Sequence, residues 1–541
     1  MATILIDGQE IEIGDDERLN GIEAARRAGV EIPHYCWHPG LSVVASCRMC
    51  LVEAGSRDAE TGDITMVPKL VPACQTPARN GTVLVTASEK VRRARAMVEE
   101  DLLLRHPTDC PICDKAGECH LQDYHFQYGQ GSRRADIRPF TSRRRTLGET
   151  VTLFVDRCVM CSRCVRFTRE ITGSSELMIS SRGSHEEIDV FPGFPLANKM
   201  SGNVVDLCPV GALGDRQFLY TQRVWFMKSH DGICTGCSSG CNIHIDENQD
   251  HIYRLRPREN RHVNQWWMCD EGRYGFHHVH STSRLVEPLR RDGDTDQSQP
   301  IDWHEVIDAI DRRLRAAEGR IAAVLSPHLT VEAAYLLARY VRDIDPQAVV
   351  AMGPVPRRGE DERFASNFTI RAEKCPNRRG IEAIVAHFMD GVASWNDLLE
   401  QCQREPFAAA WITGGTSDDW ISEDEACRFE GIGILVVHDT FASPLWQRAD
   451  FGLPAATFAE RDGCYVNHAD RLQSARWAVR PPSGVQAEGP VMWRMLGRDG
   501  LFQSQLVLAE LAAEIPYFSA ASAGVPTTGI DLKMNLVSVR S

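Results

Sequence analysis

The cysteines are the residues of this chain with the clearest chemical potential. The chain has 19 cysteines, and 15 of them lie between Cys36 and Cys269. Many of these fall in C-x-x-C-type runs, a spacing that presents several sulfur atoms to one metal centre. The N-terminus MATILIDGQEIEIG lacks the order of a secretory signal, so metal binding is a better explanation than a disulfide framework. The sequence therefore predicts a metal-rich first half and a metal-poor second half.

The first cysteine set has a long gap, then C-x-x-C, then a distant fourth cysteine. Four thiolates suit a two-iron cluster, with two thiolates on each iron, although tetrahedral zinc is an alternative. The first gap differs from the plant-type ferredoxin spacing, in which four residues separate the first pair. We predict a [2Fe-2S] site with the ligands Cys36, Cys47, Cys50 and Cys74.

The second set places a histidine just ahead of three closely spaced cysteines, in HPTDCPICDKAGEC. A lone histidine is by default an ordinary polar residue. Here no fourth cysteine is close in sequence, and a neutral imidazole can replace one thiolate, which should raise the potential of the cluster. We predict a [4Fe-4S] site with the ligands His106, Cys110, Cys113 and Cys119.

The third set is the C-x-x-C-x-x-C run of bacterial ferredoxins, but Thr168 stands where the fourth cysteine is expected. Cys208, which precedes Pro209, is the candidate replacement. One cluster is then held by all four residues, and the second ferredoxin site is lost. We predict a [4Fe-4S] site with the ligands Cys158, Cys161, Cys164 and Cys208.

The fourth set is C-x-x-C-x-x-x-C followed by a distant cysteine. This spacing suits a four-iron cluster at the start of a larger domain, with structural zinc as the alternative. We predict a [4Fe-4S] site with the ligands Cys234, Cys237, Cys241 and Cys269.

The elements that position these sets differ between the two halves. Alternating residues from Thr3 to Ile13 predict a hairpin around Asp7-Gly8, and apolar positions from Glu89 to Leu104 predict a helix ahead of the second set. Beyond residue 282 amphipathic helices alternate with short apolar strands. This alternation predicts an α/β fold with a parallel sheet. The clearest of its segments are Trp303 to Glu318, Ala322 to Ser326, Val331 to Ile344, Ala408 to Gly415 and Ile432 to Asp439.

The composition is that of a globular, multidomain chain. It has 541 residues, of which 43% are hydrophobic and 25% are charged. The net charge of -14 disfavours nucleic acid as the main partner, because phosphate binding needs an excess of positive charge. We find no uninterrupted apolar run of about 18 residues, so we expect membrane association only through partner proteins.

The four sets and their flanking residues resemble the large iron-sulfur subunit of bacterial NADH:quinone oxidoreductase, respiratory complex I. The resemblance spans residues 1 to 280 and rests on SCRMCLVE, HPTDCPICDKAGEC, CVMCSRCVRFTREI and GNVVDLCPVGAL. The second half resembles the molybdopterin-oxidoreductase fold in reduced form, in PNRRGIEA at residues 376–383 and in ADFGLPAATFAERDGCYVNHADRLQ from Ala449 to Gln473.

The resemblance implies a multidomain α+β and α/β protein. The expected parts are a β-grasp [2Fe-2S] ferredoxin domain at 1–85, a small helical [4Fe-4S] module with one histidine and three cysteine ligands at 86–125, a ferredoxin-like [4Fe-4S] module at 126–222, a molybdopterin-oxidoreductase-type [4Fe-4S] domain at 223–281, and a shortened α/β scaffold at 282–541. We expect this scaffold to hold neither molybdenum nor pterin.

The same resemblance implies an electron relay within an NADH dehydrogenase that acts as a translocase. One [2Fe-2S] and two [4Fe-4S] clusters would pass electrons from the NADH/FMN-binding subunit toward the quinone-proximal subunits, coupled in the complex to proton translocation. The fourth cluster would lie off this route. No catalytic residue and no flavin are expected on this chain. The expected place is peripheral, at the cytoplasmic face of the cell membrane, among the other peripheral-arm subunits.

Two other functions are open from the sequence. The chain could be a subunit of an NAD-linked formate dehydrogenase or hydrogenase, whose metal would need one of the isolated cysteines of the second half. Isolated thiols are more often buried small hydrophobic residues than ligands. A zinc-bound scaffold without redox function is the third possibility, and the ferredoxin run argues against it. The isolated cysteines are Cys375, Cys402, Cys427 and Cys464.

Overall fold

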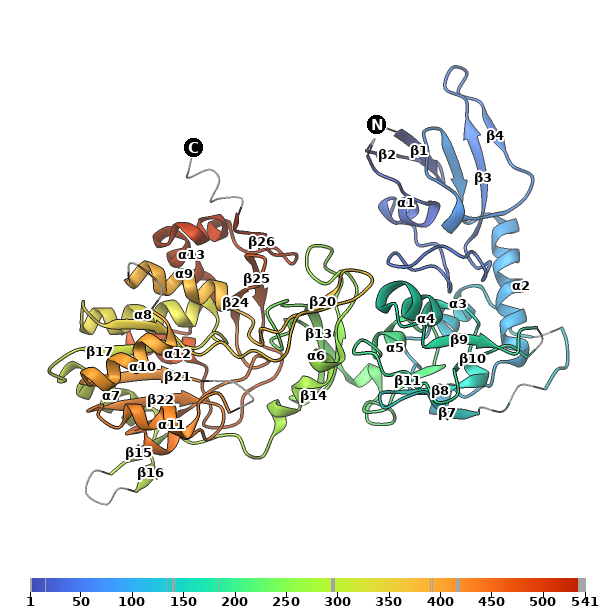
Figure 1. Cartoon of the computed structure of the whole chain (residues 1–541). Coiled ribbons are helices and arrows are strands. Elements are labelled where there is room, and N and C mark those ends of the chain that lie inside the picture. Colours follow the sequence, from blue (N-terminus) through green and yellow to red (C-terminus); the bar gives the residue numbers. More distant parts are fainter. Residues whose placement is uncertain are drawn as a thin grey trace. The chain divides into compact units, whose positions relative to one another are not determined.

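The computed structural model contains two compact units (Figure 1). The first comprises Met1–Met227 with Phe364–Asn367, and the second comprises Lys228–Arg363 with Phe368–Ser541. The structure describes residues 2–14, 16–132, 134–138, 141, 143–183, 185–292, 297–389, 391, 393–414 and 419–533. The predicted domain limits are finer than these two units, and they stay predictions.

The chain begins with a six-stranded sheet in the order β2-β1-β6-β3-β4, with β5 paired to β3. The predicted hairpin at Asp7-Gly8 is confirmed, because both residues have positive φ and join two antiparallel strands. Helix α1 (Gly21–Arg27) follows, and the Asn20 side chain caps its first turn. The strands are β1 Ala2–Ile6, β2 Gln9–Ile13, β3 Leu51–Arg57, β4 Ile64–Met66, β5 Val71–Pro72 and β6 Thr82–Val85.

Short elements carry the second and third cysteine sets. The predicted helix ahead of the second set is confirmed as α2, and a three-stranded sheet in the order β11-β8-β7 and the β9–β10 hairpin support the third set. The segment that carries the third set thus contains both helices and strands. The elements are α2 Glu89–Arg105, α3 His120–Tyr128, β7 Arg144–Thr146, β8 Val151–Phe154, α4 Arg163–Arg166, β9 Leu177–Ser180, β10 Glu187–Val190, α5 Asn203–Leu207 and β11 Leu213–Asp215.

The second unit opens with an antiparallel sheet of three strands and a short helix, which carry the fourth set. Small strands further along the chain form a two-stranded sheet and a second three-stranded sheet. These elements are β12 Lys228–Ile233, β13 Asn242–Asn248, β14 His251–Pro257, α6 Asp270–Tyr274, β19 Glu362–Arg363, β20 Thr369–Ile370, β24 Gly463–Val466, β25 Arg471–Ala475 and β26 Ile530–Asp531.

A seven-stranded sheet in the order β16-β15-β23-β22-β21-β17-β18 forms the rest of the second unit. The five strands from β23 to β18 are parallel, as the alternation of helices and strands predicts, whereas β15 and β16 add an antiparallel edge. Of the predicted segment Ala408 to Gly415, Gly415 lies outside the described residues. The strands are β15 Leu289–Arg291, β16 Ser298–Pro300, β17 Ile321–Leu325, β18 Val349–Met352, β21 Ala409–Thr413, β22 Leu435–Asp439 and β23 Phe451–Pro454.

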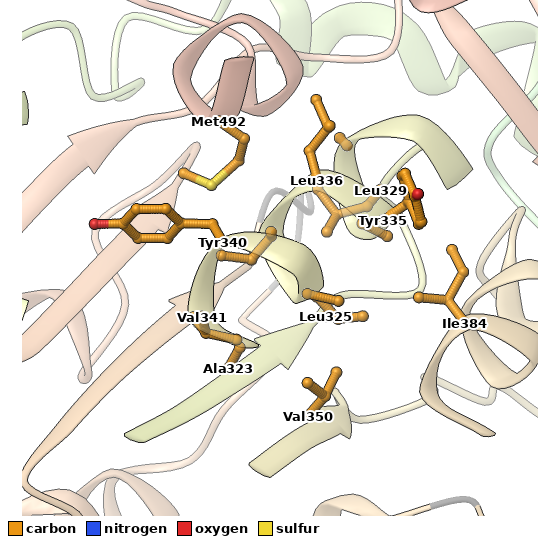
Figure 2. Close-up of a cluster of buried hydrophobic side chains, with 14 of the residues drawn as sticks. Ala323, Leu325, Leu329, Tyr335, Leu336, Tyr340, Val341, Val350, Ile384 and Met492 are labelled. Carbon is orange, nitrogen blue, oxygen red and sulfur yellow. The ribbon is translucent and has the colours of Figure 1, made fainter. Parts of the chain in front are cut away.

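Helix α8 (Val331–Ile344) is the centre of the larger hydrophobic core, since ten of its residues are buried. Figure 2 shows its side chains among residues from β17, β18, α9 and α12. A helix that is apolar on most of its circumference is stabilised by contacts on several sides. The helices of this unit are α7 Trp303–Arg315, α8 Val331–Ile344, α9 Arg378–Met389, α10 Trp395–Arg404, α11 Glu423–Ala426, α12 Glu488–Met495 and α13 Ser504–Glu514.

Candidate iron-sulfur sites

The first cysteine set lies in the loops around the N-terminal sheet. The thiols form two hydrogen-bonded pairs, Cys36 with Cys47 and Cys50 with Cys74. The bond from the Cys47 thiol, helped by backbone N–H groups, lowers the pKa of Cys36 to about 5. The Tyr35 N–H also lies 3.5 Å from Cys47 Sγ. Within each pair the contact favours the thiolate of one member, Cys36 or Cys50, and raises the pKa of the other. The thiolate is the form that binds iron. The structure thus brings together the four residues that the sequence predicts here.

The second set lies between helices α2 and α3. Cys110 is exposed, Cys113 and Cys119 are half-buried, and backbone N–H groups at the start of α3 donate to the Cys119 sulfur. Burial raises the pKa of the Cys113 and Cys119 thiols, and the charges of neighbouring thiols of the set add to this rise. His106 follows the last residue of α2, and burial lowers its pKa to about 4. Its ring is therefore neutral at pH 7, which is the form that ligates a metal.

Gly211 makes a close contact with the second set that the sequence analysis did not identify. A Cβ atom at this position would lie 2.1 Å from Cys113 Sγ. Gly211 comes three residues after Cys208, so a loop of the third set packs directly against a thiol of the second. A backbone hydrogen bond joins the same two segments, since the His120 N–H donates to the Pro209 carbonyl at 2.9 Å.

The third set surrounds one cavity. All four cysteines line it, together with apolar residues such as Leu153, Ile188 and Val210. Burial raises the pKa of the Cys161 thiol to about 11, although the nearby Arg163 and Arg166 charges oppose this rise. Four thiolates in such a place need a bound cationic group to be stable.

The fourth set lines a cavity of the second unit. Its cysteines are buried and lie beside Met268 and Ile370. The Gly272 N–H lies 3.4 Å from Cys269 Sγ at the start of α6. A Cβ atom at Gly272 would lie 2.8 Å from Cys234 Sγ, so the helix start approaches the site as closely as a glycine permits.

The donor chemistry of these sites fits iron-sulfur clusters. The third and fourth sets each place four sulfur atoms around one largely apolar cavity, and the first set groups four buried or half-buried thiols. Within the described ranges no group of three or more His, Cys, Asp or Glu side chains is arranged to hold a single metal ion. The argument for iron-sulfur clusters therefore rests on the cavities lined by the third and fourth sets and on the thiol pairs of the first set.

The α/β unit contains a larger cavity of about 440 Å³. Its wall includes His328, Thr413, Arg461 and Lys374, and the Cys234 loop closes one side. The four isolated cysteines of the second half are not part of the described wall. Three of them are buried and Cys427 is exposed.

Family models match five separate segments of the chain. They are the 2Fe-2S iron-sulfur cluster binding domain at 1–89, the NADH-ubiquinone oxidoreductase-G iron-sulfur binding region at 95–134, the ferredoxin-like domain of NADH-quinone oxidoreductase subunit 3 at 148–214, the molybdopterin oxidoreductase Fe4S4 domain at 227–281 and molybdopterin oxidoreductase at 388–488. With the cysteine sets, they define an iron-sulfur protein that carries a molybdopterin-oxidoreductase-type domain.

Comparison with curated proteins shows which iron-sulfur proteins of this class the chain is similar to. The G subunit of NADH-quinone oxidoreductase from Rickettsia felis is 34% identical over 62% of this chain and 48% of its own length. The G subunit from Streptomyces coelicolor is 33% identical over 65% of this chain and 41% of its own. The mitochondrial 78 kDa subunit of NADH-ubiquinone oxidoreductase from Candida albicans is 36% identical over 57% of this chain and 41% of its own length. Over the matched residues, the chain is a homologue of the NADH-quinone oxidoreductase G subunit.

The chain spans less than half the length of these relatives. A solved NAD+-reducing [NiFe]-hydrogenase chain is 28% identical over 41% of this chain and 91% of its own, with a TM-score of 0.34.

Among the helices that the structure describes, none has the length and apolar character needed to cross a membrane.

Proposed function

We propose that this chain is an electron relay of an NADH:quinone oxidoreductase. Its thiols and His106 would hold one [2Fe-2S] and three [4Fe-4S] clusters, which when bound accept and release one electron at a time. The chain itself fixes the position of each site, excludes water and adjusts the charge around it. Electrons would come from an NADH/FMN-binding subunit and leave toward the quinone-proximal subunits.

The observation that carries this proposal is that the first three sets are joined through their own ligand loops. Arg163, which lies between two cysteines of the third set, donates to the Trp37 carbonyl beside Cys36 at 2.5 Å. On its other side the third set reaches the second through Gly211 and Cys113. Sites linked in this way suit transfer from one to the next, whereas isolated structural metal sites have no need of such contacts.

We propose the partners and the place of action on the same basis. The homologous G subunits belong by name to a multisubunit NADH-quinone oxidoreductase. This chain would join the peripheral arm of such a complex at the cytoplasmic face of the cell membrane, and would reach the membrane only through other subunits. Quinone reduction and proton translocation would be properties of the whole complex.

The first test is the metal content of the full chain purified without oxygen. Iron and acid-labile sulfide near about 14 atoms each, without molybdenum, are the expected result. Stoichiometric molybdenum would favour the alternative, a formate-type dehydrogenase. Stoichiometric zinc without sulfide would overturn the redox function altogether.

A further inference from the structure

Two buried arginines occupy the contact between the first and third cysteine sets. Arg163 and Arg166 lie on helix α4, around Cys164, and their exposed fractions are 5% and 2%. A buried guanidinium is costly unless oxygen atoms surround it. Here three of the oxygen atoms come from a loop more than 120 residues away in the sequence, and the others come from the segments that carry the third set.

Arg166 bonds to ligand residues of both sites at once. Its Nη2 atom donates to the carbonyl oxygens of Cys36 and of Cys161, the latter at 3.3 Å, and its Nη1 atom donates to the Ser42 carbonyl at 2.5 Å. The planar guanidinium has donors on several edges, and lysine could not make these bonds together. One side chain thus fixes the distance between a ligand of the first set and a ligand of the third.

Arg163 strengthens the same contact. It donates to the Trp37 carbonyl, next to Cys36, and to the Leu207 carbonyl, next to Cys208, at 2.5 and 3.1 Å. Glu170, one turn further along, accepts from the Ser42 backbone and hydroxyl at 2.8 and 2.7 Å. The loop from Cys36 to Ser42 is therefore held along its length by the segment that follows the third set's cysteines.

The charge of Arg166 acts on both sites. Its buried guanidinium donates to the backbone carbonyls of Cys36 and Cys161, so its positive charge lies beside a ligand residue of each site. The hydrogen bonds of the guanidinium go to carbonyl and hydroxyl oxygens, which leave its charge in place. A fixed positive charge in a poorly polarisable interior favours the reduced form of a nearby centre, because reduction adds negative charge.

We propose that Arg166 is a positioning residue shared by the [2Fe-2S] site and the Cys158 set: it holds ligand loops of both at a fixed distance and raises both reduction potentials. The inference rests on the proposed relay function. It assigns to one side chain two effects on electron transfer, a geometric one and an electrostatic one. When an electron passes, one centre is oxidised and the other is reduced, and the arginine charge stays unchanged.

The test separates these effects with two substitutions in the cluster-loaded full chain. Arg166→Gln removes the charge and most of the donors, whereas Arg166→Lys keeps the charge and loses the planar fork. Arg182→Gln is the matched control, because Arg182 is an exposed arginine of the same unit, in the turn between β9 and β10. The measurements are EPR-monitored redox titrations of the [2Fe-2S] and Cys158-set signals and the dipolar coupling between the two reduced centres.

Arg166→Gln should shift both reduction equilibria about tenfold toward the oxidised form, or about 59 mV for a one-electron couple. Arg166→Lys should keep most of both potentials but change the coupling, and Arg182→Gln should change neither. If Arg166→Gln does not retain its iron, the dipolar coupling between the two centres is measured in Arg166→Lys instead. A coupling equal to that of the wild type would overturn the inference. A shift at only one site would overturn it too. If the wild-type chain shows neither of the two EPR signals, the proposed relay function itself is wrong.

Discussion

At the residue scale, the lack of a side chain at Gly211 leaves room for the Cys113 thiol of the second set. Because an added Cβ would lie 2.1 Å from Cys113 Sγ, Gly211→Ala should displace that thiol. We expect the variant to lose the cluster of the second set and retain the others, so that iron falls by about four atoms per chain. Iron analysis with EPR checks this expectation.

Gly131→Ala is the control for this prediction, because a Cβ at Gly131 has no atom within 4 Å. Full iron content in Gly131→Ala and a specific deficit in Gly211→Ala would support the close approach. Full iron content in both variants would show that the backbone shifts at little cost, and the predicted loss would then be wrong.

Glu99 should make the stability of the N-terminal unit depend on pH. It is fully buried, and burial raises its pKa to about 7, although a hydrogen bond from the Tyr35 hydroxyl opposes the rise. Because the folded state keeps the proton that the unfolded state releases near pH 4.5, this group should lower the free energy of unfolding as pH rises from about 4.5 to about 7. The loss should level off above pH 7 and amount to a few kcal/mol, on the order of 1.4 per pKa unit.

Glu99→Gln mimics the protonated form and should flatten this part of the profile. Urea midpoints of the anaerobic full chain at pH 5 and pH 8 measure the effect, and Glu89→Gln, exposed on the same helix, is the control. If the wild type and Glu99→Gln lose equal stability between these pH values, Glu99 does not carry the proton.

At the scale of elements, the periodic segments could be predicted and the long-range contacts could not. The hairpin at Asp7-Gly8 and helix α8 follow from local turn chemistry and spacing. Arg163 and Arg166 have no such local pattern. Their position within C-x-x-C-x-x-C is visible in the sequence, but their bonds to Trp37 and Cys36 depend on how two distant loops meet. The antiparallel edge formed by β15 and β16 could not be predicted either, because the sequences of short polar strands resemble those of loops.

Helix α8 should dominate the stability of the second unit. Leu336 is fully buried in the cluster shown in Figure 2, so Leu336→Ala should lower the free energy of unfolding by about 2–5 kcal/mol. Leu501→Ala, whose side chain is 87% exposed, should change it by no more than about 0.5 kcal/mol. The urea midpoint followed by circular dichroism is the measurement. A similar midpoint for both variants would mean that the site collapses around the cavity, contrary to the packing argument.

At the scale of the whole molecule, the four cysteine sets are divided between two units, and this division bears on the proposed function. Three sets lie in the first unit and are linked through their loops, and the fourth belongs to the second unit. The grouping of the cysteines into sets could be predicted from sequence spacing, because C-x-x-C runs are local patterns. The links between the sets were not, since they arise only from folding.

A pair of serine substitutions should therefore have unequal consequences in an assembled complex. Cys161→Ser removes a ligand from the set that contacts both the first and the second, whereas Cys269→Ser removes one from the set of the other unit. Each variant should lose about four iron atoms. Only Cys161→Ser should abolish NADH-driven quinone reduction, because it interrupts the linked series, and Cys269→Ser should retain most of it. Activity and iron content are measured on the same purified complex. Equal loss of activity in both variants, with the remaining clusters intact, would place the fourth site on the electron route and refute its peripheral role.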